Sequence, residues 1–263
     1  MLFPFHDDAP RRNPPVATIA IIMANAVVFL WSQGLPPGRQ QEIGYRWGFV
    51  PARARQLVDP RPLVVTLETE EAPGLLWAPP PRLVLPPEPG QFALSLLTCM
   101  FLHAGWLHLI GNMWFLWIFG DNVEDRLGHV AYVLFYLTGG VVASFAHWLA
   151  QPASTTPVIG ASGAIAAVLG AYAVTWPWAR VRTLLFLFVF VTIIELPALL
   201  VLGLWFLAQV VGEAEFHQGV GQSVAWGAHI GGFITGLLLM PPLSALLGAG
   251  PRQAPHDWPY DSL

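Results

Sequence analysis

Three polar motifs inside apolar stretches contain the side chains that could do chemistry. Ser162 lies within the sequence GASG, His229 lies within GAHIGG, and a third motif carries His108 and Asn112. A serine becomes a nucleophile when a base accepts its proton, and histidine is the usual base. We place Ser162 at a helix N-terminus, where free backbone N–H groups and the positive dipole end can stabilise an oxyanion. The pattern therefore indicates acyl transfer.

The third motif supplies further hydrogen-bond donors. His108 and Asn112 are spaced i, i+4, so they share one face of a helix, and His103 precedes them. Both side chains can donate toward the charge that develops on an oxyanion. Glycines at intervals of four residues, such as Gly227 and Gly231, let two membrane helices approach closely. Close approach is needed if the Ser162 hydroxyl is to reach a His229 ring nitrogen.

Each motif also has a simpler interpretation. A membrane serine often bonds to its own helix backbone, and glycine spacing often serves packing alone. His103 and His108 could bind a metal ion or haem, although their spacing matches no established metal signature, and we expect no metal and no cofactor. Glu213 and Glu215 could orient His229 from a preceding loop, but a Ser–His dyad needs neither. His147 and His217 have no evident partner.

Other protease classes are excluded by missing residues. Every aspartate lies outside the apolar segments, which excludes an intramembrane aspartyl dyad. The sequence has no His-Glu pair for a zinc protease motif, and it has no lysine for a Ser–Lys dyad. Cys99 is the single cysteine, so no internal disulfide is possible, and packing is the usual role of such a residue.

Composition predicts a membrane protein. The 263 residues are 55% hydrophobic and 11% charged, with a mean hydropathy of +0.55, whereas soluble domains carry about 25% charged residues. The net charge of −4 and the lack of a basic stretch predict no nucleic-acid partner. The expected partners are the lipid bilayer and transmembrane proteins, and the sequence does not indicate an oligomeric state.

Six apolar segments predict an all-α polytopic membrane protein with six transmembrane helices. They are 16–31, 92–119, 130–150, 158–176, 183–211 and 224–247. The second is too long for one span, so we expect a surface or re-entrant beginning and a crossing near 105–119. The fifth contains Glu195, which would be costly at mid-bilayer. We expect the fifth crossing to run from Glu195 to about Gly212, with 184–194 at the interface.

Arginine distribution predicts the topology. Short connections on one side hold Arg11, Arg12, Arg126, Arg180, Arg182 and Arg252, and the short connections on the other side hold none. This bias predicts a cytoplasmic tail at 1–15, a membrane domain at 16–247 with a long outer loop at about 33–91, and a cytoplasmic, disordered tail at 248–263. Twelve arginines without lysine, together with 25 prolines and 25 glycines, suggest a GC-rich bacterial genome. We therefore expect a bacterial cytoplasmic (inner) membrane.

Together these motifs resemble those of the rhomboid family of intramembrane serine proteases. The resemblance covers about residues 14–247 and includes the stretch GDNVEDRLG at 120–128. It implies a six-helix rhomboid core with Ser162 as nucleophile and His229 as general base and acid. It also implies an oxyanion hole formed by His108, Asn112 and the Ser162 backbone N–H. Glu124 and Arg126 would be a structural pair in the loop after the second helix.

The sequence departs from the family pattern at several positions. Ala166 stands where some members have an aromatic residue that packs against the histidine, so His229 must be held differently. Gly111 replaces a bulky gate residue, the outer loop is extended between Arg53 and Gly90, and Trp205 and Phe206 are candidate gate residues.

The alternative to a protease is a catalytically silent relative that binds membrane clients, and such relatives typically lack the serine or the histidine. A transporter that uses the intramembrane histidines and Glu195 is a third hypothesis.

Overall fold

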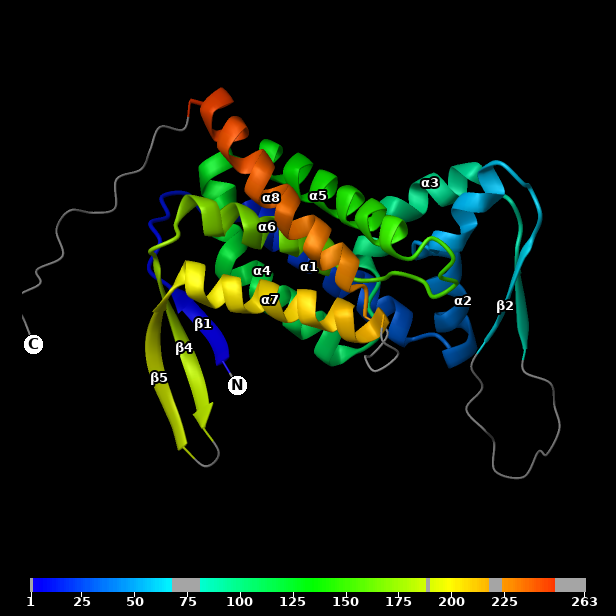
Figure 1. Ribbon diagram of the computed structural model, residues 1–263, viewed down its shortest axis with the longest axis horizontal. Helices are drawn as coiled ribbons and strands as arrows, with labels where there is room; N and C mark the ends of the chain where they lie inside the picture. Colours follow the sequence, from blue (N-terminus) through cyan, green and yellow to red (C-terminus); the bar gives the residue numbers. More distant parts are fainter. Residues whose placement is uncertain (1, 68–80, 188–189, 218–223, 249–263) are drawn as a thin grey trace, which may run out of the picture.

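The computed structural model describes residues 2–67, 81–187, 190–217 and 224–248 (Figure 1). Its main body is a bundle of helices that lie side by side. The long helices are α1 (Val16–Gln33), α4 (Trp106–Leu127), α5 (His129–Ala150), α6 (Ser162–Thr175), α7 (Ala198–His217) and α8 (Trp226–Leu246). A small sheet lies at each end of the bundle. The tail expected at 248–263 falls almost wholly outside the described residues.

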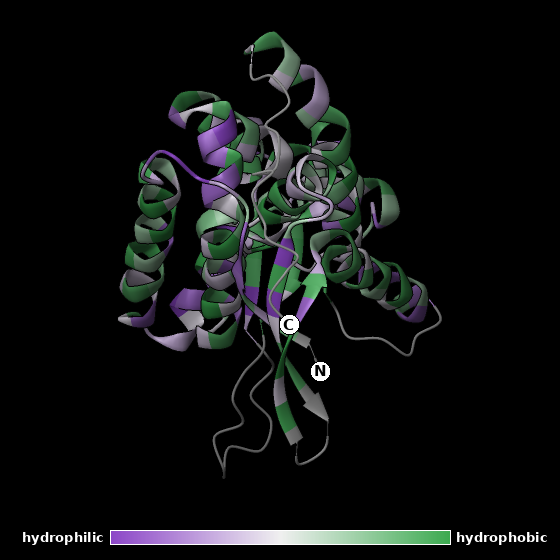
Figure 2. Cartoon of the chain, turned by 90° about the vertical axis from the view of Figure 1, so that its left-hand side faces the viewer, coloured by the Kyte–Doolittle hydropathy of each residue, from purple (hydrophilic) through white to green (hydrophobic). Residues whose placement is uncertain are grey.

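Several of these helices could cross a membrane. Within the described ranges α1, α5, α7 and α8 are long and apolar enough, and Figure 2 shows that hydrophobic residues occupy much of the length of the helices. The mostly helical polytopic membrane fold is thus confirmed. The expected number of six crossings is not confirmed, because α6 has only 14 residues and α4 qualifies only together with the segment before it.

The second apolar segment is broken, as its length predicted. Helix α3 (Pro89–Thr98) and the 3-10 turn η2 (Cys99–Phe101) precede α4 and meet it at an angle of 80°. The break falls just before Trp106, where Gly105 is fully extended. The crossing expected near 105–119 therefore corresponds to α4, which continues further than expected and ends at Leu127.

The fifth apolar segment contains a hairpin that the sequence pattern did not predict. Strand β4 (Arg180–Leu187) pairs with β5 (Phe190–Pro197), and α7 begins only at Ala198. Glu195 lies in β5, is exposed, and pairs with Arg182 at 3.1 Å and Arg180 at 3.5 Å. The helix therefore starts three residues after Glu195, close to the expected boundary, and Glu195 and its two arginine partners belong to the hairpin rather than to α7.

The N-terminal segment contributes a third strand to this sheet. Strand β1 (Leu2–Asp7) pairs with β4, which gives the order β1-β4-β5. Asp7 accepts a hydrogen bond from the Tyr172 hydroxyl of α6 and one of 3.3 Å from the Ala9 N–H. Burial raises the pKa of Asp7 from 3.8 to about 6, although these hydrogen bonds lower it. The expected N-terminal tail is thus attached to the bundle.

The raised pKa of Asp7 predicts that stability depends on pH. The folded protein binds the Asp7 proton more tightly than the unfolded chain does, so this stabilisation is complete below pH 3.8 and is lost as pH rises through about 6. Thermal unfolding of the wild type and of Asp7→Asn should be compared across that window. We expect the wild type to lose stability relative to Asp7→Asn as pH rises. Parallel pH curves would contradict this linkage.

The end of α4 caps the beginning of α1. The two carboxylate oxygens of Glu124 accept hydrogen bonds of 2.7 Å from the backbone N–H groups of Ala17 and Thr18. The first backbone N–H groups of a helix have no partner within that helix. Glu124 also lies 2.5 Å from the His129 ring. Arg126 lies 3.5 Å from the Ser244 hydroxyl of α8. Both residues thus lie in the last turns of α4 rather than in a loop, and both join helices.

The long connection between α1 and α3 is partly regular. It contains α2 (Pro37–Trp47), the 3-10 helix η1 (Pro51–Leu57) and a hairpin of β2 (Leu63–Thr66) with β3 (Arg82–Leu85). The buried Arg53 guanidinium donates to Gln91 Oε1 at 3.0 Å and to Gln56 Oε1 at 3.2 Å. Arg53 thereby anchors the connection to the start of α3.

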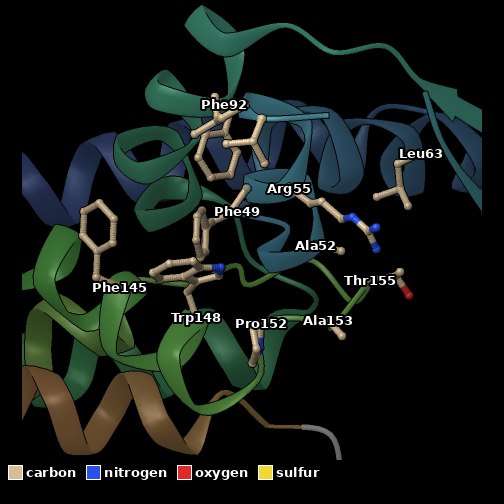
Figure 3. Close-up of a pocket in the computed structure, with 13 residues that line it drawn as sticks. Phe49, Ala52, Arg55, Leu63, Phe92, Phe145, Trp148, Pro152, Ala153 and Thr155 are labelled. Atoms are coloured by element: carbon tan, nitrogen blue, oxygen red, sulfur yellow. The ribbon is translucent and has the colours of Figure 1, made fainter. Parts of the chain in front are cut away.

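An apolar cavity of about 730 Å³ lies between this connection and α5. Figure 3 shows the rings of Phe49, Phe92, Phe145 and Trp148 gathered along it. The Phe49 and Phe92 ring centroids are 5.6 Å apart. None of the polar residues singled out in the sequence lines this cavity, so it is separate from the cavity described below.

Candidate active site

Ser162 and His229 meet where α6 begins. Ser162 is the first residue of α6, and His229 lies in the first turn of α8. The Ser162 Oγ atom is 2.8 Å from His229 Nε2, which is hydrogen-bond distance for a nucleophile and its base. Helix α6 has no side-chain cap at its N-terminus, and the first backbone N–H groups of a helix have no intrahelical partner.

Small residues bring α6 and α8 together at this point. Helix α6 lies at the centre of the bundle, and every residue from Gly163 to Ala173 is buried. A Cβ atom on Gly232 would overlap the carbonyl oxygen of Gly163, and one on Gly236 would overlap that of Ala167. Glycine in α8 therefore lets its backbone touch that of α6, which holds the two side chains within reach of each other.

Substitution of Gly232 by alanine is expected to separate these helices. The added Cβ meets backbone, which cannot rotate aside as a flexible side chain could, and it would also lie 3.1 Å from Ala166 Cβ. Overpacking of this kind costs about 1–3 kcal/mol. Thermal unfolding in detergent measures the loss. The matched control is Gly203→Ala in α7, where a Cβ meets nothing within 4 Å. Equal stability of the two variants would refute the argument.

The other two predicted site residues face the loop before Ser162. A Cβ built on Gly160 would lie 2.6 Å from His108 Nε2 and 3.5 Å from Asn112 Nδ2, and Gly160 has a φ of +121°. Only glycine suits that position, because the backbone is left-handed and the two α4 side chains lie against it. The Gly160 N–H donates to the Cys99 carbonyl at 2.9 Å, which ties this loop to the bend before α4.

Both α4 side chains have a donor directed toward this region. Asn112 is buried, and its Nδ2 group makes no hydrogen bond within the described part of the chain. The Ala104 N–H donates to His108 Nδ1 over a long 3.5 Å, so in neutral His108 the hydrogen resides on Nε2. Both donors and Ser162 line one cavity of about 630 Å³ together with His229. The structure therefore brings the four predicted residues into one site.

His229 is held by residues that the sequence analysis did not assign to it. The Trp205 ring lies 5.9 Å from the His229 ring, and the Trp226 ring meets it edge-on at 6.1 Å. Gln209 Oε1 is 2.7 Å from His229 Nδ1. These contacts replace the aromatic neighbour that Ala166 cannot provide. A single glutamine in an apolar helix was the available signal for Gln209.

Of the remaining candidates, only Trp205 lines the described cavity. His103 is buried and contacts the His108 ring at 5.1 Å, but it does not line the cavity. Glu213 belongs to α7 rather than to a loop and pairs with His217 at 2.9 Å. Trp205 lines the cavity, whereas Phe206 stacks on Phe233 at 4.7 Å. The described residues thus leave Trp205 as the better-placed gate candidate.

Comparison with known proteins places this site in a family. A sequence model of the Rhomboid domain matches residues 91–246. Rhomboid-like protein 11, chloroplastic, of Arabidopsis thaliana is 30% identical over 172 residues, which cover 60% of this chain and 55% of that protein. Rhomboid protein 1, mitochondrial, of Saccharomyces cerevisiae is 33% identical over 156 residues, which cover 55% of this chain and 40% of that protein. The chain thus spans about half the length of these curated relatives.

The names of these relatives contradict the expected location, and the family match confirms the expected family. Their names refer to chloroplasts and mitochondria, which contradicts the expected location in a bacterial cytoplasmic membrane. That expectation rested on arginine, proline and glycine content, which reports codon usage and carries no targeting information. The matched region extends over more than half of the 263 residues and includes both motifs that meet at the site. The chain therefore belongs to the rhomboid family.

Proposed function

We propose that this protein is an intramembrane serine endopeptidase that cleaves transmembrane segments of other membrane proteins. The observation that carries the proposal is the 2.8 Å contact between Ser162 Oγ and His229 Nε2. The cavity beside it is lined by residues of α4 and α7, among them Leu107, Phe115 and Trp205. A largely apolar wall of this kind suits a hydrophobic substrate segment.

The proposed reaction begins with attack by Ser162. His229 Nε2 takes the hydroxyl proton while Oγ bonds to the carbonyl carbon of the scissile peptide. The oxyanion that forms would be stabilised by the Ser162 backbone N–H and by the side chains of Asn112 and His108. His229 then gives the proton to the leaving amine as the C–N bond breaks. Water hydrolyses the resulting acyl-enzyme, again with His229 as base, and Ser162 is restored.

The substrate must expose its backbone before it can react. In a transmembrane helix each carbonyl is hydrogen-bonded and sterically shielded, so the segment has to unwind locally. We therefore expect residues of weak helix propensity near the cleaved bond, and small residues at the bond itself. The chemistry uses only side chains and backbone groups of this chain and a water molecule.

The test is cleavage of a model transmembrane substrate by the purified protein in liposomes. Ser162→Ala is the matched inactive variant, and Ser144→Ala is the control, because Ser144 is a buried serine of α5 outside the cavity. A fluorophosphonate probe, which reacts with activated serines, provides a second readout. We expect cleavage and labelling by the wild type and by Ser144→Ala, and neither by Ser162→Ala.

Other outcomes would decide against the proposal. Cleavage that persists in Ser162→Ala would reject the site. A wild type that is neither labelled nor active, but that retains a membrane protein stably in detergent, would favour a catalytically silent relative that binds clients. Proton-coupled flux that survives in Ser162→Ala would favour a transporter.

A further inference from the structure

Gln209 contacts His229 on the side away from the serine. Its Oε1 atom lies 2.7 Å from His229 Nδ1. Its Nε2 group donates a hydrogen bond of 2.9 Å to the Trp205 carbonyl oxygen, one turn earlier in α7. The Gln209 side chain is buried, with 6% of its surface exposed. Both ends of the amide are therefore used inside an apolar helix bundle.

These contacts determine which ring nitrogen of His229 carries the hydrogen. The Trp205 carbonyl can only accept, so the amide NH₂ of Gln209 must face it. The end that faces His229 is then Oε1, which also can only accept, and Nδ1 must be the donor. A neutral imidazole with hydrogen on Nδ1 has its lone pair on Nε2. That lone pair faces the Ser162 hydroxyl at 2.8 Å.

We propose that Gln209 is a positioning residue that holds His229 in the tautomer able to accept the Ser162 proton. This inference rests on the proposed function and extends the dyad by a third residue. A buried aspartate has this role in soluble serine proteases. A neutral amide fulfils it here without placing a carboxylate inside the bundle, where an ionised group is costly. The Trp205 carbonyl is the anchor that prevents the amide from turning over.

Two substitutions separate positioning from packing. Methionine has nearly the shape of glutamine but offers Nδ1 only a weak sulfur acceptor in place of the amide oxygen. Glutamic acid keeps an acceptor for Nδ1, and in its protonated form it also donates to the Trp205 carbonyl. If Gln209 only fills space, Gln209→Met should be tolerated and Gln209→Glu should be the harmful change. If Gln209 positions His229, the order is reversed.

The first readout is the rate of cleavage in liposomes, with kcat and KM measured separately. We expect Gln209→Met to lower kcat by about 10–100-fold, the loss typical when the hydrogen-bond partner of a metal-bound histidine is removed. KM should change little, because the substrate-binding walls remain. Gln209→Glu should restore most of the lost kcat. Thermal unfolding of each variant verifies that the fold is kept.

The second readout does not depend on catalysis. Nitrogen-15 NMR of histidine-labelled protein distinguishes a protonated from an unprotonated ring nitrogen, and His229→Ala identifies the signals of His229. We expect Nδ1 protonated and Nε2 unprotonated in the wild type, and a mixture of tautomers in Gln209→Met.

The outcomes separate this inference from the proposed function. A wild type that does not cleave would reject the proposed function, while the spectra would still decide whether Gln209 fixes the tautomer. Wild-type kcat together with an unchanged His229 spectrum in Gln209→Met would overturn the inference and leave the dyad intact.

Discussion

Replacing either Ser162 or His229 by alanine is expected to lower kcat by roughly 10⁶-fold, the loss found for such residues in soluble serine proteases. Replacing both should cost no more than replacing one. The reason is the 2.8 Å contact between Oγ and Nε2, through which the two side chains act as one unit. A serine without its base is a weak nucleophile, and a base without its serine has nothing to activate.

Cleavage of a transmembrane substrate in liposomes by the two single variants and the double variant measures this non-additivity. If the fold loss of kcat in the double variant equals the product of the two single losses, each residue acts alone. That result would contradict a dyad even if both single variants were slow.

Asn112→Ala is expected to lower kcat by about 10²–10³-fold with little change in KM. The Asn112 Nδ2 donor, which has no hydrogen-bond partner among the described residues, lies beside Gly160, two positions before the serine, and its bond to the oxyanion would form only as the carbonyl is attacked. An interaction made only in the transition state appears in kcat.

The matched control for Asn112 is Asn122→Ala. Asn122 is a buried asparagine of the same helix, but it donates to the Ala9 carbonyl at 3.0 Å, far from the cavity. That variant should lose stability and keep its kcat. A large rise in KM for Asn112→Ala, with kcat unchanged, would instead make Asn112 a substrate-binding residue.

The motifs in the sequence singled out the four residues that the structure brings together at the candidate site. Polar residues are rare in apolar segments, so Ser162, His229, His108 and Asn112 were conspicuous, and the helices that carry them lie close to the expected ranges. The break before Trp106 followed from a segment too long for one span.

Other features could not be read from the sequence for physical reasons. A short continuous apolar run cannot be assigned to a strand or to a helix by its periodicity, so the β4–β5 hairpin looked like part of a long helix. Gln209 was overlooked because its importance depends on α7 packing beside α8, which periodicity does not reveal. The boundary of α7 was also misplaced, which put Glu213 in a loop.

The cap that Glu124 provides for α1 has a consequence for biogenesis. The N–H group of Ala17 and the Glu124 carboxylate that accepts from it are separated by 107 positions in the chain. The ribosome makes the chain from its N-terminus, so α1 is synthesised long before its cap exists. Until the end of α4 has been made, the backbone N–H groups in the first turn of α1 must bond to water or to lipid headgroups. The capped form of α1 therefore cannot exist before the end of α4 has been synthesised.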